Sequence, residues 1–409
     1  MRETPADSRV IQAKHRHPDR LPLWIVGAKA PLQRGMDKAR RGINRLGEFN
    51  ARLSAHAQHS SAVLMDGVRG YLASAPALAP IRQALEAIGS RRESAPPAQA
   101  KLVAAVPRVA LEREVAALRE LGNTPDGLQI RVGGLGRYSL LLREIGRLRE
   151  ASFRAVGEGT GRALDIDRYD AWYEHIVLWD AKARAVVGAY RVCRGARVLA
   201  TRGLTGLYTA SLFEFDGPAR ERINQGMELG RSFVAPEYWG TRSLDDLWLG
   251  IGAYLRAHPE VRYLLGPVSI SAALPISARE HLVAFYGQHF GPPEVLAEDR
   301  QKPGVRARRP FRFLAQAPCY RGLDTEQSFK LLRANLDGLG VRVPVLYKQY
   351  TELCEPGGAR FLAFGVDPDF TNCVDGLIEI DLHRMQARKA RRYLGDAAIS
   401  LSTPPEAAA

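Results

Sequence analysis

Residues 227–234 read MELGRSFV, an apolar segment of strand length that carries an acid and a base within it. Its pattern predicts a β-strand, and Glu228 and Arg231 would then lie inside a sheet. A charge buried in a sheet costs free energy unless a partner balances it. The segment therefore predicts either an ionic brace between strands or a site where the charges do chemistry.

Two more segments place charges where apolar residues are expected. Residues 187–192 (VGAYRV) predict a strand that contains Arg191, and residues 164–170 (LDIDRYD) form an acidic loop. Upstream, Arg149 lies near the end of a predicted helix. In an arbitrary α/β protein, pairing of these charges with one another is the expected structural explanation. The acids of the loop are Asp165, Asp167 and Asp170.

The pattern around these segments predicts the order β-α-β-β-β-α-β-α, which indicates a mixed α/β (α+β) sheet and not a doubly wound one. A further helix is predicted over residues 111–121, and the tail adds a helix and two strands. The predicted strands are 128–132, 175–179, 185–193, 227–234, 262–270 (interrupted at Gly266 and Pro267), 359–366 and 376–381. The other predicted helices are 137–153, 244–257, 275–289 and 345–353.

The charge balance points to anionic partners. The chain of 409 residues has a net charge of +14, and residues 1–100 hold 16 Lys/Arg against 8 Asp/Glu. Further basic runs occupy residues 300–312 and 384–392. Acidic carrier proteins, anionic membrane surfaces and nucleic acids all suit such a surface, but no recognised nucleic-acid motif is present, so we predict no specific nucleic-acid binding.

Other classes are disfavoured by what the sequence lacks. The four cysteines show no C-x-x-C pair and no nearby histidine cluster, which predicts neither a metal site nor a disulfide framework. No apolar run reaches the ~18 residues that span a bilayer, and the polar N-terminus does not resemble a signal peptide. We predict a cytoplasmic protein that contacts the inner face of the membrane peripherally.

Residues 149–231 resemble the acyl-homoserine-lactone synthases and ornithine-lipid N-acyltransferases, which are GNAT-fold enzymes that take acyl chains from acyl carrier protein. The family has an arginine late in the first helix, an acidic loop, a strand arginine and an E-L-S-R or E-L-G-R strand. Phrases such as RAVGEGTGRALDIDRYD, ELGRSFVAPEY, LLGPVSIS and FGVDPDF also resemble the hemolysin-like GNAT module of bacterial lysophospholipid-acyltransferase fusion proteins. That resemblance runs from about residue 105 to 395.

The resemblance implies a function and roles for particular residues. The enzyme would transfer a fatty acyl group, such as a 3-hydroxyacyl group, from acyl carrier protein to the amine of an amino acid such as ornithine, giving a lyso-aminolipid. It implies a catalytic group in which Glu228 is the base or amine anchor and a backbone N–H near Ser232 binds the oxyanion. The implied catalytic residues are Glu228, Arg231 and Ser232, and the implied substrate-binding residues are Arg149, Asp165, Asp167, Asp170, Arg191, Ser269 and Ser271, with no metal and no bound cofactor.

Two departures from related patterns refine the prediction. Acetyl-CoA-using members of the fold carry a Q/R-x-x-G-x-G/A loop that binds pyrophosphate at a helix N-terminus, whereas residues 235–243 read APEYWGTRS. This favours acyl carrier protein over acyl-CoA as the donor. A glycerolipid acyltransferase also needs a His-x4-Asp pair. Because His15 is followed at that spacing by Arg20, we predict no O-acyltransferase activity from the N-terminal region.

We therefore predict a core with extensions. Residues 1–100 would be a degenerate or truncated, basic, mostly helical region, and residues 101–126 a connecting helix and linker. The GNAT-like core would cover 127–300, followed by a C-terminal extension packed on it (301–395) and a flexible tail (396–409). The alternatives are a non-catalytic, membrane-associated GNAT-fold protein that is hemolysin-like, or a partner domain of a lysophospholipid acyltransferase.

Overall fold

The computed structural model describes residues 99–292, 304–314, 316–320 and 322–395. The predictions for residues 1–98 and for the tail from residue 396 lie outside the described residues.

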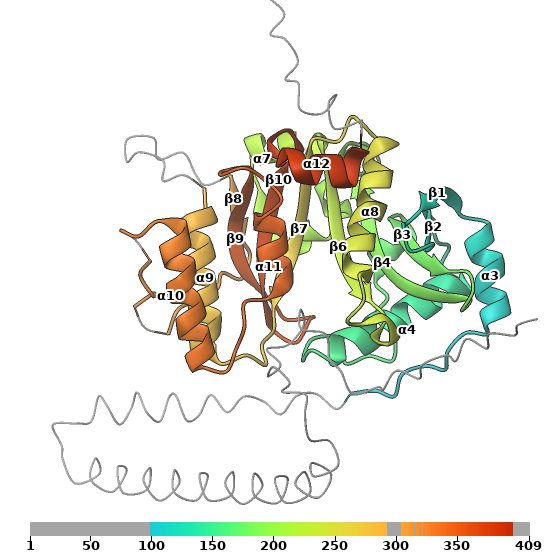
Figure 1. The fold of residues 1–409 in the computed structure, drawn as a ribbon, viewed down its shortest axis with the longest axis horizontal. Helices are drawn as coiled ribbons and strands as arrows, with labels where there is room; N and C mark the ends of the chain where they lie inside the picture. Colours follow the sequence, from blue (N-terminus) through green and yellow to red (C-terminus); the bar gives the residue numbers. More distant parts are fainter. Residues whose placement is uncertain (1–98, 293–303, 315, 321, 396–409) are drawn as a thin grey trace, which may run out of the picture. The chain divides into compact units, whose positions relative to one another are not determined.

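A sheet of eight strands forms the centre of the described chain (Figure 1). Neighbouring strands run antiparallel, except for the central pair β6 and β7, which is parallel. The fold is therefore the mixed α/β arrangement that the sequence predicts. In spatial order the strands are β1 (Arg119–Asn123), β2 (Gln129–Gly134), β3 (Glu174–Asp180), β4 (Ala185–Arg194), β6 (Gly226–Val234), β7 (Tyr263–Ile270), β10 (Cys373–Asp381) and β9 (Ala359–Asp367).

Helices cover both faces of this sheet. On one face lie α8 (Ser243–Arg256), α9 (Ile276–Phe290) and α11 (Val345–Thr351), with α10 (Thr325–Gly338) packed on α9 and α12 (Ala387–Leu394) packed on α8. On the other face lie α3 (Arg108–Ala116), α4 (Leu140–Arg154), α5 (Gly195–Arg202), α6 (Thr209–Leu212) and α7 (Gly217–Asn224). A small second sheet pairs β5 (Phe213–Phe215) with β8 (Val305–Ala307).

The helix α4 shows how local sequence sets these positions. The side chain of Ser139 accepts a hydrogen bond from the backbone N–H of Leu142 at 3.0 Å and so caps the helix start. Leu141, Ile145 and Leu148 recur at helical spacing and are buried against the sheet. The same rotation places Arg149 on a buried face, near the acidic loop.

The strands β6 and β7 part after three paired residues. Their register runs from Gly226 opposite Tyr263 to Glu228 opposite Leu265 and then ends. On its other side, β6 has a bulge against β4, and Arg231 adopts the left-handed backbone region with φ 49°. The bulge lets the strand bend away from β7 while it stays paired with β4, which opens a gap in the middle of the sheet.

Three predictions about elements need correction. The strand β7 is not interrupted at Gly266 and Pro267, because its pairing with β10 continues through both residues. Proline is tolerated at a free strand edge, and β7 has such an edge where β6 has left it. The helix predicted over 111–121 ends at Ala116, and Arg119 begins β1 of the main sheet. Residues 359–381 do not merely pack on the core, since they supply β9 and β10 of the same sheet.

We predict that Gly266→Ala lowers the free energy of unfolding by about 1–3 kcal/mol, as overpacking does elsewhere. A Cβ atom at Gly266 would lie 2.2 Å from the backbone oxygen of Leu229 on β6. Urea denaturation measures the change. Gly338→Ala is the matched control, since its Cβ meets nothing within 4 Å. Equal stability of the two variants would contradict the close approach of β6 and β7.

Candidate active site

A cavity of about 510 Å³ occupies the gap between β6 and β7. Its walls come from both strands, from the loop after α4, from β10 and from residues 340–346 leading into α11. Leu264 and Leu265, adjacent on β7, belong to core clusters on opposite faces of the sheet, and both line the cavity. The cavity therefore passes through the sheet and has an end on each face.

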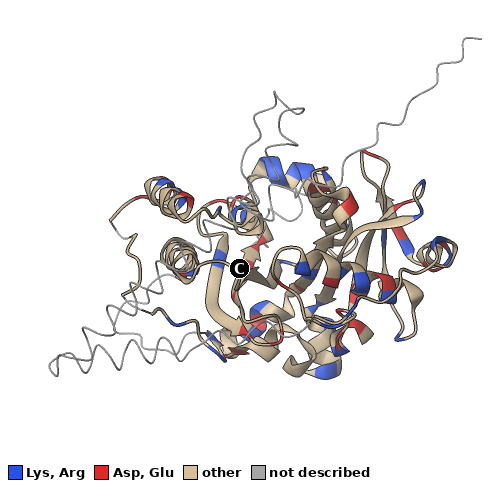
Figure 2. Ribbon diagram, turned by 90° about the horizontal axis from the view of Figure 1, so that it is seen from below, with Lys and Arg blue, Asp and Glu red and all other residues tan. Residues whose placement is uncertain are grey.

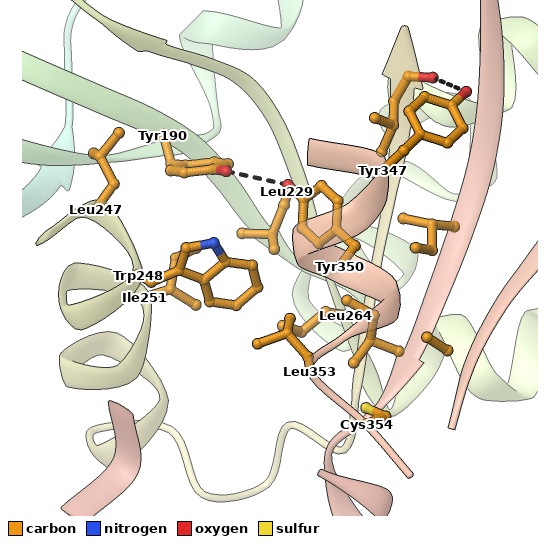
Figure 3. Close-up of a cluster of buried hydrophobic side chains, with 14 of the residues drawn as sticks. Tyr190, Leu229, Leu247, Trp248, Ile251, Leu264, Tyr347, Tyr350, Leu353 and Cys354 are labelled. Atoms are coloured by element: carbon orange, nitrogen blue, oxygen red, sulfur yellow. Dashed lines mark hydrogen bonds between the residues drawn. The ribbon is translucent and has the colours of Figure 1, made fainter. Parts of the chain in front are cut away.

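The two ends differ in chemistry. The end on the α8 and α11 face, called the apolar end, is lined by Tyr190, Leu229, Leu264, Leu346 and Tyr350. There the hydroxyl groups of Tyr190 and Tyr350 are hydrogen-bonded to each other at 3.1 Å (Figure 3). The pairing satisfies both hydroxyls, so they leave an apolar surface facing the cavity.

The end on the opposite face, called the polar end, is lined by Glu158, Tyr208, Arg231, Ser269 and Asp375. Ser269 on β7 and Asp375 on β10 are directly paired in register, so their side chains share this face. The cavity thus joins a polar chamber to an apolar one through the parted strands.

Glu158 is the carboxylate whose position in the cavity is best suited to proton transfer. It lies in the turn after α4, held by a backbone hydrogen bond to Phe153 and between Gly157 and Gly159, which both have positive φ. Ser269 donates a hydrogen bond to its Oε2 at 2.9 Å. Burial raises the pKa of Glu158 to about 7, against the lowering effects of the Ser269 hydrogen bond and Arg231. A carboxylate with this pKa can accept a proton near neutral pH.

The charges predicted from the sequence come together beside the cavity. Arg149 on α4 forms an ion pair with Asp170 at 2.8 Å, and Arg191 on β4 bonds Asp167 at 2.6 Å and lies 3.3 Å from Asp170. Arg149, Asp170 and Arg191 are at most 1% exposed, and none of them lines the cavity. This geometry supports a role for Arg149 and Arg191 in organising the acidic loop, and the substrate-binding role implied for them stays a prediction.

The acidic loop is held by this network from within. Asp167 caps the short helix η2 (Arg168–Ala171), and the Asp170 carboxylate in turn accepts a hydrogen bond from the backbone N–H of Asp167 at 2.9 Å. Burial would raise the pKa of Asp170, but Arg149 and Arg191 lower it well below its usual range. Burial also lowers the pKa of His175, which contacts Asp170, to about 4. At neutral pH Asp170 is therefore charged, between two arginines and a neutral histidine.

Arg231 connects this network to the cavity. Its guanidinium lies 3.6 Å from Asp165 and 3.8 Å from Asp167, without a hydrogen bond to either. The rings of Tyr208 and Phe370 lie 5.1 and 4.7 Å from its central carbon. Because Arg231 also lines the cavity, its N–H groups are placed to bind an anionic group of a ligand.

Glu228 is close to Arg191 but lies outside this cavity. The two residues occupy diagonal positions on β6 and β4, with the Tyr173 ring 5.2 Å from the Arg191 guanidinium. The Glu228 carboxylate accepts hydrogen bonds from the hydroxyls of Tyr173, at 3.0 Å, and Thr209, at 2.7 Å. Burial raises its pKa. The carboxylate predicted as base is thus enclosed by protein groups, and its catalytic role stays a prediction that this geometry does not favour.

The predicted serines do line the cavity. Ser232 lies at the bulge of β6, where neither it nor Arg231 has a register partner on β4. Ser271 donates to the backbone oxygens of Val156 and Gly157 at 3.2 and 3.1 Å, so it also positions the turn that carries Glu158.

Sequence reasoning missed Glu158, Tyr208 and Asp375. An acid flanked by two glycines after a helix is a signal that could have singled out Glu158. Tyr208 lies in a segment, residues 195–224, for which no elements were assigned. Asp375 lies two residues beyond Cys373, in a strand whose start the prediction placed at residue 376, and nothing in its local pattern separates it from an ordinary strand acid.

Elsewhere, basic and acidic residues are interspersed over the described elements (Figure 2). The helix α12 carries Arg388, Arg391 and Arg392 on its exposed side. No group of His, Cys, Asp and Glu side chains suited to a metal ion occurs in the described part of the chain. Within the same residues, no helix combines the length and the apolar character that crossing a bilayer requires.

We predict that Arg191→Gln lowers the free energy of unfolding by about 3–5 kcal/mol, because it removes the ion pair of the partly buried Asp167 and leaves the buried Asp170 with Arg149 alone. Arg194→Gln, three residues along the same strand, should cost about 1 kcal/mol or less, since its ion pair with Glu260 is partly exposed. Denaturant unfolding of both variants measures the contrast. A loss no larger for Arg191→Gln than for Arg194→Gln would show that the network does not hold the loop.

Comparison with known proteins agrees with this geometry. The model of the acetyltransferase (GNAT) domain family matches residues 148–249. A glycine N(alpha)-acyltransferase of Phocaeicola vulgatus is 33% identical over 225 residues, which cover 52% of this chain and 68% of that protein. An L-ornithine N(alpha)-acyltransferase of Rhizobium meliloti is 30% identical over 254 residues, covering 61% of this chain and 77% of that protein. No solved structure gives a significant match.

These relatives share at least 30% identity with the chain over more than two thirds of their own length. Both are acyltransferases that act on the α-amine of an amino acid, by their names. Residues 148–249, which match the GNAT domain family, include the bulged strand β6 and the charged network. The chain belongs to the GNAT-fold N-acyltransferases.

Proposed function

We propose that this protein transfers a fatty acyl group from acyl carrier protein to the α-amine of an amino acid, giving an N-acyl amino acid. The observation that carries the proposal is the cavity through the sheet, with an apolar end on one face and a polar end on the other. Such a cavity suits a reaction between an apolar donor and a zwitterionic acceptor that meet at the gap.

The apolar end suits an alkyl chain. Tyr190, Leu229, Leu264 and Tyr350 supply a surface that the hydrocarbon can bury, at about 25 cal/mol per Å² of apolar area removed from water. A 3-hydroxyacyl group would place its hydroxyl near the gap, where the polar end begins. The thioester carbonyl would then lie beside the bulge of β6.

The polar end suits an amino acid. Arg231 would bind the carboxylate, and Glu158 would hold the ammonium group and accept its proton. The names of relatives include glycine and L-ornithine as acceptors, and both have the carboxylate and α-ammonium that this pair requires. Ornithine as the acceptor is therefore one form of the proposal.

The reaction needs no covalent enzyme intermediate. Glu158 takes a proton from the ammonium, and the free amine attacks the thioester carbonyl carbon. A backbone N–H at the bulge, near Ser232, stabilises the oxyanion that forms. Collapse of the tetrahedral intermediate breaks the C–S bond, the leaving thiolate takes up the proton that the amide nitrogen gives up, and Glu158 releases its own proton to solvent. The products are the amide and the thiol of the carrier.

Acyl carrier protein is favoured over acyl-CoA by the start of α8. Where a pyrophosphate would bind, this helix carries Asp245 and Asp246 in its first turn. Acids at a helix N-terminus repel a phosphate group that would otherwise bind there. An acidic carrier protein is instead attracted by the net charge of +14. The exposed arginines of α12 support the further proposal of contact with an anionic membrane surface.

We predict that Glu158→Gln lowers kcat by about 10²–10⁴, the usual contribution of a general base. In the unsubstituted protein, kcat/KM should rise with pH up to about 7 and then level off, because Glu158 accepts a proton only when ionised. N-acylation of amino acids by carrier protein loaded with a 3-hydroxyacyl chain is the assay.

Glu228→Gln is the informative comparison for this experiment. Like Glu158→Gln, it replaces a glutamate carboxylate with an amide. The Glu228 carboxylate, however, is bonded to Tyr173 and Thr209 and does not line the cavity. If Glu228→Gln loses the rate while Glu158→Gln keeps both the rate and the pH profile, then Glu228 is the base and the assignment of Glu158 is wrong.

We predict that kcat/KM for acyl carrier protein exceeds that for the matching acyl-CoA and falls as the salt concentration rises. Electrostatic steering of an acidic partner is screened over about 8–10 Å at physiological ionic strength. Steady-state rates with both donors between low and moderate salt give the comparison. Equal rates with acyl-CoA, unaffected by salt, would remove the carrier protein from the proposal.

A further inference from the structure

Asp375 is a buried carboxyl at the polar end of the cavity. It lies outside the residues that match the GNAT domain family. It lies on β10, beyond residues 148–249, and its exposed fraction is 5%. It lines the cavity next to Ser269. Within the residues that the structure describes, no hydrogen bond or ion pair reaches its side chain. Burying a carboxyl without a hydrogen-bond partner costs free energy, unless a ligand in the cavity supplies that partner.

The groups around Asp375 are mostly acidic. Asp367 on β9 lies diagonally across from it on the same face, and Glu158 approaches from the turn after α4. Arg231 on β6 is the cation that acts on Asp375. The other titratable groups that interact with it are the hydroxyls of Tyr208 and of Tyr347 on α11 and the Cys373 thiol of β10. Burial raises the pKa of Asp375 well above its usual range, and Asp367 and Glu158 raise it further, against Arg231.

The polar end holds more acidic groups than basic ones. Glu158, Asp367 and Asp375 are three carboxyls, and Arg231 is shared with Asp165 and Asp167 of the acidic loop. Asp367 is partly satisfied, because the Tyr208 hydroxyl donates to it at 2.7 Å, but a hydroxyl supplies no charge. An amino acid without a charged side chain brings one ammonium and one carboxylate, so it leaves this imbalance unchanged. A diamino acid brings one positive charge more.

We propose that Asp375, with Asp367 beside it, binds the side-chain ammonium of a diamino-acid acceptor. This inference rests on the proposed function, since it concerns the acceptor of the same site. The acceptor carboxylate lies at Arg231, its α-ammonium at Glu158 and its second ammonium at Asp375. Asp375 loses its proton to solvent as the cation binds, because the ion pair favours the charged carboxylate. The C-terminal strands thereby select the acceptor, while the residues around β6 carry out the transfer.

The test compares L-ornithine with L-norvaline, which has the same carbon chain and lacks the second amine. With the unsubstituted protein, kcat/KM for ornithine should exceed that for norvaline by at least about 30-fold, as expected for a buried charge pair. Asp375→Asn should remove most of this preference, because it should raise KM for ornithine far more than it changes KM for norvaline. Asp369→Asn is the matched control, on the exposed turn of the same hairpin, and should keep the preference.

Several outcomes would overturn the inference. Equal acylation of norvaline and ornithine by the unsubstituted protein would do so and would leave the proposed function standing. Loss of both activities in equal proportion in Asp375→Asn would assign Asp375 a purely structural role. If no amino acid is acylated from any thioester, the proposed function fails, and calorimetry of ornithine and norvaline binding then tests the role of Asp375 by itself. Tighter binding of ornithine that Asp375→Asn abolishes would support this role. Equal binding of the two amino acids would overturn it.

Discussion

The parting of β6 from β7 is the constraint on which the rest of this structure depends. Backbone N–H and C=O groups inside a protein need hydrogen-bond partners. Where two neighbouring strands separate, each loses the hydrogen bonds that the other would have supplied. Beyond Glu228 and Leu265 the two strands no longer pair. The bulge at Arg231 and the proline at position 267 are both features that a strand can accommodate at such an edge. The gap they surround is where a ligand's own polar groups can meet the backbone.

The buried ionic network fixes the position of Arg231 beside the gap. Arg149, Arg191 and Asp170 are sealed within the protein, so they hold the acidic loop against β4 without contacting a ligand. Arg231 is the member that reaches both the network and the cavity. The sequence predicted either an ionic brace or a chemical role for these charges. Each explanation applies to different residues of the one cluster. Most of the cluster braces the fold, and the brace fixes the position of the residue that faces the ligand.

Much of the fold was predictable from the sequence, because the apolar spacing of β3, β4, β6 and α8 is regular and their ends carry turn or capping residues. The pairing of Arg191 with the loop acids was also predictable, since a buried arginine requires acids nearby. The position of Glu228 relative to the cavity was not, because the strand pattern gives its face of the sheet but not what covers that face. There Tyr173 and Thr209 enclose it. Asp375 was missed because its importance arises from a partner strand, β7, about a hundred residues earlier in the chain.

That long separation bears on how the molecule is made. The strand β7 (Tyr263–Ile270) gains its second neighbour only from β10 (Cys373–Asp381), and contacts so distant in sequence form late because a long loop must first close. On the ribosome, synthesis proceeds at about 5–20 residues per second. The GNAT-matched stretch therefore emerges many seconds before β10, which contributes Asp375 to the cavity wall, has been made. Until then the nascent chain exposes the edge of β7 that β10 covers in the mature protein.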